Sequence, residues 1–286
     1  NKVSAATSRW VMGASKWHHS LSAEDVRVLE DVRIRSQSER RPIAIATNHL
    51  SWTDITTIMS VFPETRFGAK LELLLVLPLG AVLLAGRHTM LPRPSKNASP
   101  AARARAFAQV RGAGEKMLKY GVSTLFFLPG TRSKTGTIGR PKTGAANLAL
   151  GTDALLLTGS LLGTNEVMGL SWGKLFTRGT GMDRRVFSRF RVIDSNDHRT
   201  VTEGEPSLED VRTLTNQAHQ AIEDLFFNEA DELRRLAQSG DRMAQSQLST
   251  LVSNLQPGMD LILNGQLERA QRWAEGTGGK NQGMKT

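Results

Sequence analysis

The sequence predicts an α/β protein, and three patterns support that prediction. Residues 43–46 and 122–128 are short apolar segments with the composition of buried strands. The first leads into a helical pattern that Pro63 ends. After Ser207, apolar residues recur every three or four positions, as in an amphipathic helix. A chain of 286 residues with 39% hydrophobic and 22% charged residues is globular and can bury a substantial core.

The first 24 residues predict an amphipathic helix. Its apolar stripe includes two tryptophans, and Lys2, Arg9 and Lys16 supply a basic face. This combination is typical of a helix that lies on a membrane surface. A helix packed on its own domain would use the same stripe, and the pattern favours neither arrangement over the other.

Periodicity also predicts the elements farther along the chain. Partial alternation of apolar residues predicts a strand over residues 26–34. Alternating basic and apolar residues over 184–193 are typical of an exposed edge strand, and a half-buried strand is favoured over a contact with lipid or nucleic acid. Helical spacing predicts a basic, alanine-rich helix over 101–120 and one or two helices between 240 and 273. The Gly/Lys-rich end of the chain is expected to be disordered.

A candidate catalytic pair follows the strand at residues 43–46. His49 is a candidate base, because an unperturbed imidazole titrates near working pH. Asp54 is a candidate orienter of one ring nitrogen. Residues five apart on a straight helix point roughly 140° away from each other. The two side chains therefore meet only if the chain turns between them, with Ser51 or Thr53 capping a helix that begins near Asp54. A hydrogen-bonded pair without a catalytic role is the alternative.

A candidate anion-binding turn follows the strand at residues 122–128. Gly130 would let backbone N–H groups approach a phosphate or oxyanion closely. Arg132 offers a planar fork for bidentate phosphate binding, and Thr131 and Ser133 add hydroxyl donors. Taken alone, the same residues are also compatible with an ordinary turn that exposes a surface charge.

Composition narrows the classes of partner. The net charge of +10 favours phosphorylated substrates, an acidic carrier protein, anionic lipid or nucleic acid. With 6% aromatic residues and no recognition motif, nucleic acid is not expected. The absence of cysteine excludes disulfides, a thiol nucleophile and thiolate metal sites. The longest apolar run, residues 73–85, is too short to span a bilayer. Because the chain begins with Asn1, we expect a processed or trimmed form, and a removed targeting segment or anchor stays open.

Two motifs resemble a known family. Residues 48–54, Asn-His-Leu-Ser-Trp-Thr-Asp, resemble the Asn-His-x-x-x-x-Asp signature of the glycerolipid acyltransferases. Residues 130–133, Gly-Thr-Arg-Ser, resemble the end of that family's Phe-Pro-Glu-Gly-Thr-Arg-Ser block. Weaker similarities cover segments around Lys70, Arg93 and Lys142. The resemblance extends over about residues 25–165.

The resemblance implies a fold and a set of roles. The fold would be a mostly parallel central sheet flanked by helices. His49 would deprotonate a glycerol hydroxyl, which then attacks an acyl thioester, and Asp54 would support His49. The phosphate of the acceptor would lie near a group of residues from the remaining motifs. These are Arg132, Gly130, Thr131, Ser133, Lys70, Arg93 and Lys142. No metal or cofactor is implied, and acyl-CoA or acyl-carrier protein would be the co-substrate.

One departure from the family pattern affects the expected acceptor. Leu128 and Pro129 stand where the family has proline and glutamate, and that glutamate helps to hold the acceptor glycerol. Proline has no carboxylate and no N–H donor. The leading acceptor is 1-acylglycerol-3-phosphate. Glycerol-3-phosphate or another polar alcohol is an alternative, and so is a catalytically impaired protein that binds lipids or partners.

Together with the basic amphipathic N-terminus, the resemblance implies a membrane-associated enzyme of phospholipid synthesis. The interfacial helix would occupy residues 1–24, the acyltransferase domain 25–235, and a helical extension with a disordered tail 236–286. We expect the protein to sit on a membrane peripherally, at a cytoplasmic or organelle-stromal face. Its partners would be that membrane surface, a lysophospholipid or glycerophosphate acceptor and, as one of two donors, acyl-carrier protein.

Overall fold

The computed structural model describes most of the chain between residues 17 and 254. The described residues are 17–70, 74–75, 81, 83–84, 86, 88–91, 99–133, 136–167, 184–200 and 205–254. Strands and helices alternate along much of this length. In chain order they are β1 (Trp17–Ser20), α2 (Ala23–Ser38), β2 (Ile43–Thr47), α3 (Thr53–Val61), β3 (Arg66–Lys70), β4 (Thr89–Leu91), α5 (Pro100–Lys119), β5 (Thr124–Phe127), α6 (Gly144–Gly151), β6 (Leu155–Leu162), α7 (Thr164–Val167), β7 (Arg184–Asp194), the 3-10 helix η3 (Ser195–His198), α8 (Leu208–Gln238) and α9 (Arg242–Asn254).

The described strands form a single mixed sheet in the order β1-β7-β6-β2-β5-β3-β4. Only the β6–β7 pair is antiparallel, and the other five pairs are parallel. This agrees with the expected mostly parallel sheet. β2 lies between β5 and β6, and all five of its residues are buried. The carboxyl ends of β2 and β5 therefore lie side by side, which is where open α/β sheets bind their ligands.

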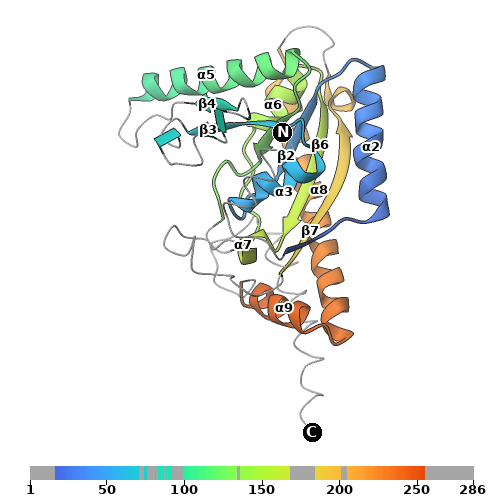
Figure 1. Cartoon of the computed structure of the whole chain (residues 1–286). Helices are drawn as coiled ribbons and strands as arrows, with labels where there is room; N and C mark the ends of the chain where they lie inside the picture. Colours follow the sequence, from blue (N-terminus) through green and yellow to red (C-terminus); the bar gives the residue numbers. More distant parts are fainter. Residues whose placement is uncertain are drawn as a thin grey trace.

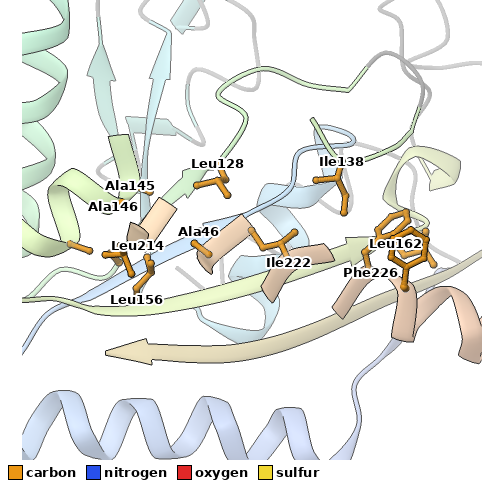
Figure 2. Close-up of a cluster of buried hydrophobic side chains, with 14 of the residues drawn as sticks. Ala46, Leu128, Ile138, Ala145, Ala146, Leu156, Leu162, Leu214, Ile222 and Phe226 are labelled. Carbon is orange, nitrogen blue, oxygen red and sulfur yellow. The ribbon is translucent and has the colours of Figure 1, made fainter. Parts of the chain in front are cut away.

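Helices cover both faces of the sheet (Figure 1). On β2, Ile43 and Ile45 join a core that also contains apolar residues of α2 and α3. Ala44 and Ala46 face the opposite core, which α6, α8 and α9 complete. Figure 2 shows Ala46 beside side chains of α8 in this second core. Successive side chains of a strand point to opposite faces of the sheet, so β2 contributes to both cores. The result is a three-layer α/β/α domain.

The prediction of a strand over residues 26–34 is wrong, because these residues belong to α2. Ser22 and Asp25 form a reciprocal capping box that begins the helix. Asp25, Leu29 and Val32 are its buried residues, at helical spacing. The alternation was only partial, whereas the cap and the spacing of three and four residues both specify a helix.

The predicted N-terminal helix is wrong for its last residues. Trp17–Ser20 form β1, which pairs in parallel with the first four residues of β7. Residues 1–16 lie outside the described part of the chain. β7 pairs with β1 over Arg184–Phe187 and with β6 over Phe187–Asp194, so only Phe187 has a described strand on both sides. Val186, Phe187, Ser188 and Phe190 are buried, which agrees with a half-buried strand.

The C-terminal helices are continuous with the domain. α8 runs for 31 residues and passes the expected boundary between residues 235 and 236. α9 buries Ala244 and Leu251 in the same core as α8, so it packs as part of that layer. Residues beyond 254 lie outside the described part. Among the helices that the structure describes, none combines the length and the apolar composition needed to cross a bilayer.

A buried acid joins α8 to the sheet. Glu229 is fully buried, and its Oε2 accepts a hydrogen bond of 2.6 Å from the hydroxyl of Ser160 on β6. Burial raises the pKa of Glu229 to about 8, with Asp25 and Glu232 adding to the rise and Arg189 opposing it. The folded protein therefore holds a proton on Glu229 at neutral pH.

This proton makes stability depend on pH. The ordinary pKa of glutamate is 4.5, so between 4.5 and about 8 the folded state binds a proton that the unfolded state lacks. The contribution of Glu229 to stability should fall as pH rises through this window. We expect Glu229→Gln, which cannot ionise, to gain stability relative to the native protein as pH rises from 4.5 to about 8. Denaturant midpoints measured across the window check this, and parallel curves for the two proteins would contradict it.

Candidate active site

His49 and Asp54 meet in the turn between β2 and α3. His49 Nδ1 lies 2.8 Å from Asp54 Oδ2, so the predicted contact is present. The side chain of Asp54 is fully buried, whereas 13% of the His49 side chain is exposed. Asp54 is the second residue of α3, where a carboxylate also suits the helix dipole. With Nδ1 held by the carboxylate, Nε2 is the ring nitrogen left to exchange a proton with a substrate.

Asp54 also holds the turn itself together. Its Oδ2 accepts hydrogen bonds from the backbone N–H groups of Leu50 at 2.7 Å and Ser51 at 2.8 Å, in addition to the imidazole. Neither Ser51 nor Thr53 occupies the N-cap position of α3, which Trp52 takes without a side-chain hydrogen bond. The Ser51 hydroxyl instead accepts from the backbone N–H of Thr53. One carboxylate oxygen therefore accepts the N–H groups of the turn before the helix and also orients the histidine.

Buried polar side chains anchor the same turn to the rest of the sheet. The amide of Asn48 donates to the carbonyl of Leu161 at 2.8 Å and accepts from its N–H at 2.9 Å. Both bonds extend the contact of β2 with β6 beyond the last strand pair, Thr47 with Gly159. Thr53 donates its hydroxyl to the carbonyl of Thr164 in α7. The position of His49 is thus fixed by β6 and α7 as well as by its own strand.

The ring of Phe127 covers one face of the imidazole. The two ring centroids are 3.7 Å apart and the rings are inclined by only 8°. Phe127 is the last residue of β5 and is in register with Thr47 of β2, two residues before His49. Sequence reasoning missed this residue. The phenylalanine of the family block stands at this position, but its contact with His49 follows from the pairing of β5 with β2.

The candidate anion-binding turn is hydrogen-bonded to the segment that carries the candidate catalytic pair. Leu128 N donates to the carbonyl of Thr47, and Ser133 N donates to the carbonyl of His49, both at 2.8 Å. The turn after β5 is therefore hydrogen-bonded on both sides of Asn48. Gly130 has a φ of +70°, a conformation that glycine adopts without strain.

Arg132 is the charged group nearest to this pair on the turn. Its guanidinium carbon lies 5.2 Å from the centroid of the Trp52 ring. Burial lowers the pKa of Arg132, and the negative charge of Asp54 opposes that fall. Among the described residues, no carboxylate lies within ion-pair distance of Arg132. A half-buried guanidinium without a paired carboxylate is a suitable partner for a phosphate.

The other predicted phosphate ligands differ in position. Thr131 is exposed, and the hydroxyl of Ser133 accepts backbone N–H bonds from Gly136 and Thr137, which stabilises the turn. Lys142 is exposed, and its side chain passes over Gly130. A Cβ atom placed on Gly130 would lie 3.2 Å from the Nζ of Lys142.

Two further predicted ligands are described only in part or not at all. Lys70 ends β3, but its side chain is outside the described part, and Arg93 is outside it entirely. Pro129, which replaces the family glutamate, is buried against Gly139. The described residues contain no group of three histidine or acidic side chains that could hold a metal.

Comparison with known proteins identifies relatives of this region. Residues 27–161 match the family described as Acyltransferase. Over 131 residues the chain is 29% identical to a chloroplastic 1-acyl-sn-glycerol-3-phosphate acyltransferase of Arabidopsis thaliana, covering 46% of this chain and 35% of that protein. Over 142 residues it is 28% identical to the human 1-acyl-sn-glycerol-3-phosphate acyltransferase beta, covering 49% and 46%. The chain thus spans between about a third and a half of the length of these relatives.

A solved structure shares the fold. The 1-acyl-sn-glycerophosphate acyltransferase PlsC of Thermotoga maritima superposes with a TM-score of 0.53 at 20% sequence identity, covering 78% of each chain. This similarity extends beyond the segment that the family match covers. It includes the same general arrangement of a sheet flanked by helices.

The geometry of Asp54 predicts that two substitutions differ in their effect on stability. Asp54→Ala leaves the buried N–H groups of Leu50 and Ser51 without an acceptor, so we expect a loss of about 2 kcal/mol or more. Asp54→Asn keeps an oxygen at that point and should cost clearly less. Unfolding midpoints of the two variants and the native protein provide the comparison. Equal midpoints for both variants would show that Oδ2 does not hold the turn.

Proposed function

We propose, on the premise that residues 27–161 belong to the glycerolipid acyltransferase family, that this chain transfers a fatty acyl group from a thioester to a hydroxyl of a glycerophosphate-type acceptor. One observation carries the proposal. His49 is held by Asp54 through Nδ1, and its backbone carbonyl accepts a hydrogen bond from the N–H of Ser133, in the turn that bears Arg132. These contacts support a proposed base and a proposed anion site beside each other at the carboxyl ends of two parallel strands.

The proposed reaction begins with proton transfer. His49 Nε2 takes the hydroxyl proton as the acceptor oxygen attacks the carbonyl carbon of the thioester. An oxygen–carbon bond forms and the carbon–sulfur bond breaks. The sulfur takes the proton that His49 carried and leaves as a thiol. Asp54 keeps the imidazole in one orientation and stabilises its charged form through the reaction.

Arg132 would bind the phosphate of the acceptor. Its guanidinium is half-buried, is not paired with a described carboxylate, and stands over Trp52. Lys142, whose side chain lies over Gly130, would add a second positive charge at the edge of the turn. Lys70 and Arg93 retain the roles that the family resemblance gives them, as proposed phosphate ligands.

The partners follow from the same proposal. The donor would be acyl-CoA or acyl-carrier protein, and the leading acceptor is 1-acylglycerol-3-phosphate, the substrate class named for the relatives. The chain would work on a membrane surface, at a cytoplasmic or organelle-stromal face. Relatives with chloroplastic names support the organelle setting.

The first test concerns the base. We expect His49→Ala to lower kcat by about 10²–10⁴-fold, the usual contribution of a general base, while its unfolding midpoint stays near that of the native protein. His198→Ala, on η3 and outside the catalytic pair, is the matched histidine control. Product should be quantified by mass spectrometry for each donor with a panel of acceptors. Equal turnover by the two variants would exclude His49 as the base.

The second test concerns the phosphate. Arg132→Ala should raise the KM for a phosphorylated acceptor by about 10–100-fold, because a charged hydrogen bond is lost. The KM for the matching monoacylglycerol, which lacks the phosphate, should not change. Arg140→Ala removes an exposed charge farther along the same loop and serves as the control. A similar rise in KM for both acceptors would contradict phosphate binding by Arg132.

Pro129 favours a second candidate function. A chain without the glutamate that holds the acceptor glycerol is also compatible with a lipid-binding protein that has lost turnover. The acceptor panel together with a vesicle-binding measurement separates the enzyme from the lipid-binding protein. The lipid-binding protein would bind vesicles that contain lysophospholipid and would form no product from any acceptor.

A further inference from the structure

We infer that Phe127 is a positioning residue for acyl transfer, whose ring fixes the plane of the His49 imidazole and stabilises the imidazolium formed during the reaction. This inference rests on the proposed function. Phe127 stands where the family block Phe-Pro-Glu-Gly-Thr-Arg-Ser has its phenylalanine, and the inference gives that apolar side chain a role.

The form of the stack supports the role. With centroids 3.7 Å apart and planes inclined by 8°, the two rings overlap almost face to face. Two neutral aromatic rings prefer an offset or edge-to-face arrangement over this one. A positive charge over the face of a benzene ring is attracted by the ring quadrupole. The observed arrangement is therefore better suited to the charged imidazolium than to the neutral ring.

The surroundings leave the imidazole few alternatives. Asp54 Oδ2 holds Nδ1, and Phe127 closes one face. Asp54 also accepts two backbone N–H bonds that fix its own position, and its charge interacts with that of Arg132. A substrate hydroxyl can then approach along the Nε2 edge. Two contacts at right angles, one in the ring plane and one perpendicular to it, define the orientation of the base.

Phe127 is itself held firmly. It ends β5, which pairs with the central strand β2, and it packs against the core formed with α2 and α3. The preceding residue, Phe126, is also half-buried but points to the opposite core. The chain thus provides a matched control, because replacing either phenylalanine by leucine removes a ring of the same size from the same strand.

The experiment compares Phe127→Leu, Phe127→Tyr and Phe126→Leu in the full chain. For Phe127→Leu we expect kcat to fall by about 10–100-fold with little change in acceptor KM, because orientation is lost and binding is not. Phe127→Tyr keeps the ring and should recover most of the rate. Phe126→Leu should keep the native kcat. The split between kcat and KM, together with rescue by tyrosine, would not arise from a general loss of stability.

A second readout does not depend on turnover. The Cε1 proton of a histidine stacked on phenylalanine is shifted upfield by the ring current, and NMR of the native protein, assigned with His49→Ala, measures this shift. We expect the shift to persist in Phe127→Tyr and Phe126→Leu and to disappear in Phe127→Leu. Native rates for Phe127→Leu would overturn the inference and leave the proposed function standing. A stacked His49 resonance in a native chain that forms no product would support the stack and overturn the proposed function.

Discussion

The hydrogen bonds accepted by one carboxylate oxygen, Asp54 Oδ2, determine the geometry of the whole site. The imidazole and two consecutive backbone N–H groups converge on this buried atom, and that convergence makes the chain reverse between β2 and α3. Because the imidazole and the backbone donate to the same oxygen, the orientation of His49 and the path of the turn depend on each other. The cost of burying the charge is offset by the bonds that it accepts.

The rest of the fold brings other elements to that turn. Asn48 extends the β2–β6 contact past the end of the strand pairing, and β5 delivers Phe127 on the other side. The two faces of β2 also differ, with isoleucines toward α2 and α3 and alanines toward α6 and α8. Close packing on both faces leaves the central strand with little freedom to move, so the turn at its end is held on a rigid element.

Local patterns were sufficient for much of this architecture. β2, β5 and the helix after Ser207 were predictable because short apolar runs and a strong cap specify them locally. The contact of His49 with Asp54 was predictable because a turn before a helix is the one geometry that brings residues five apart together. Partial alternation predicts a strand over residues 26–34, whereas the capping box of Ser22 and Asp25 and the helical spacing of the buried residues specify α2. The neighbours of β7 and the stack of Phe127 on His49 depend on strand pairing, which is a property of the tertiary structure.

The hydrogen bond from Ser133 N to the carbonyl of His49 has a consequence for selectivity. It joins the segment that carries the guanidinium to the segment that carries the imidazole, so neither can shift without the other. Under the proposed function, the distance between the guanidinium and the imidazole would then select acceptors by their length. An alcohol whose anionic group and hydroxyl match that span would engage both ends at once, and a longer or shorter molecule would reach only one.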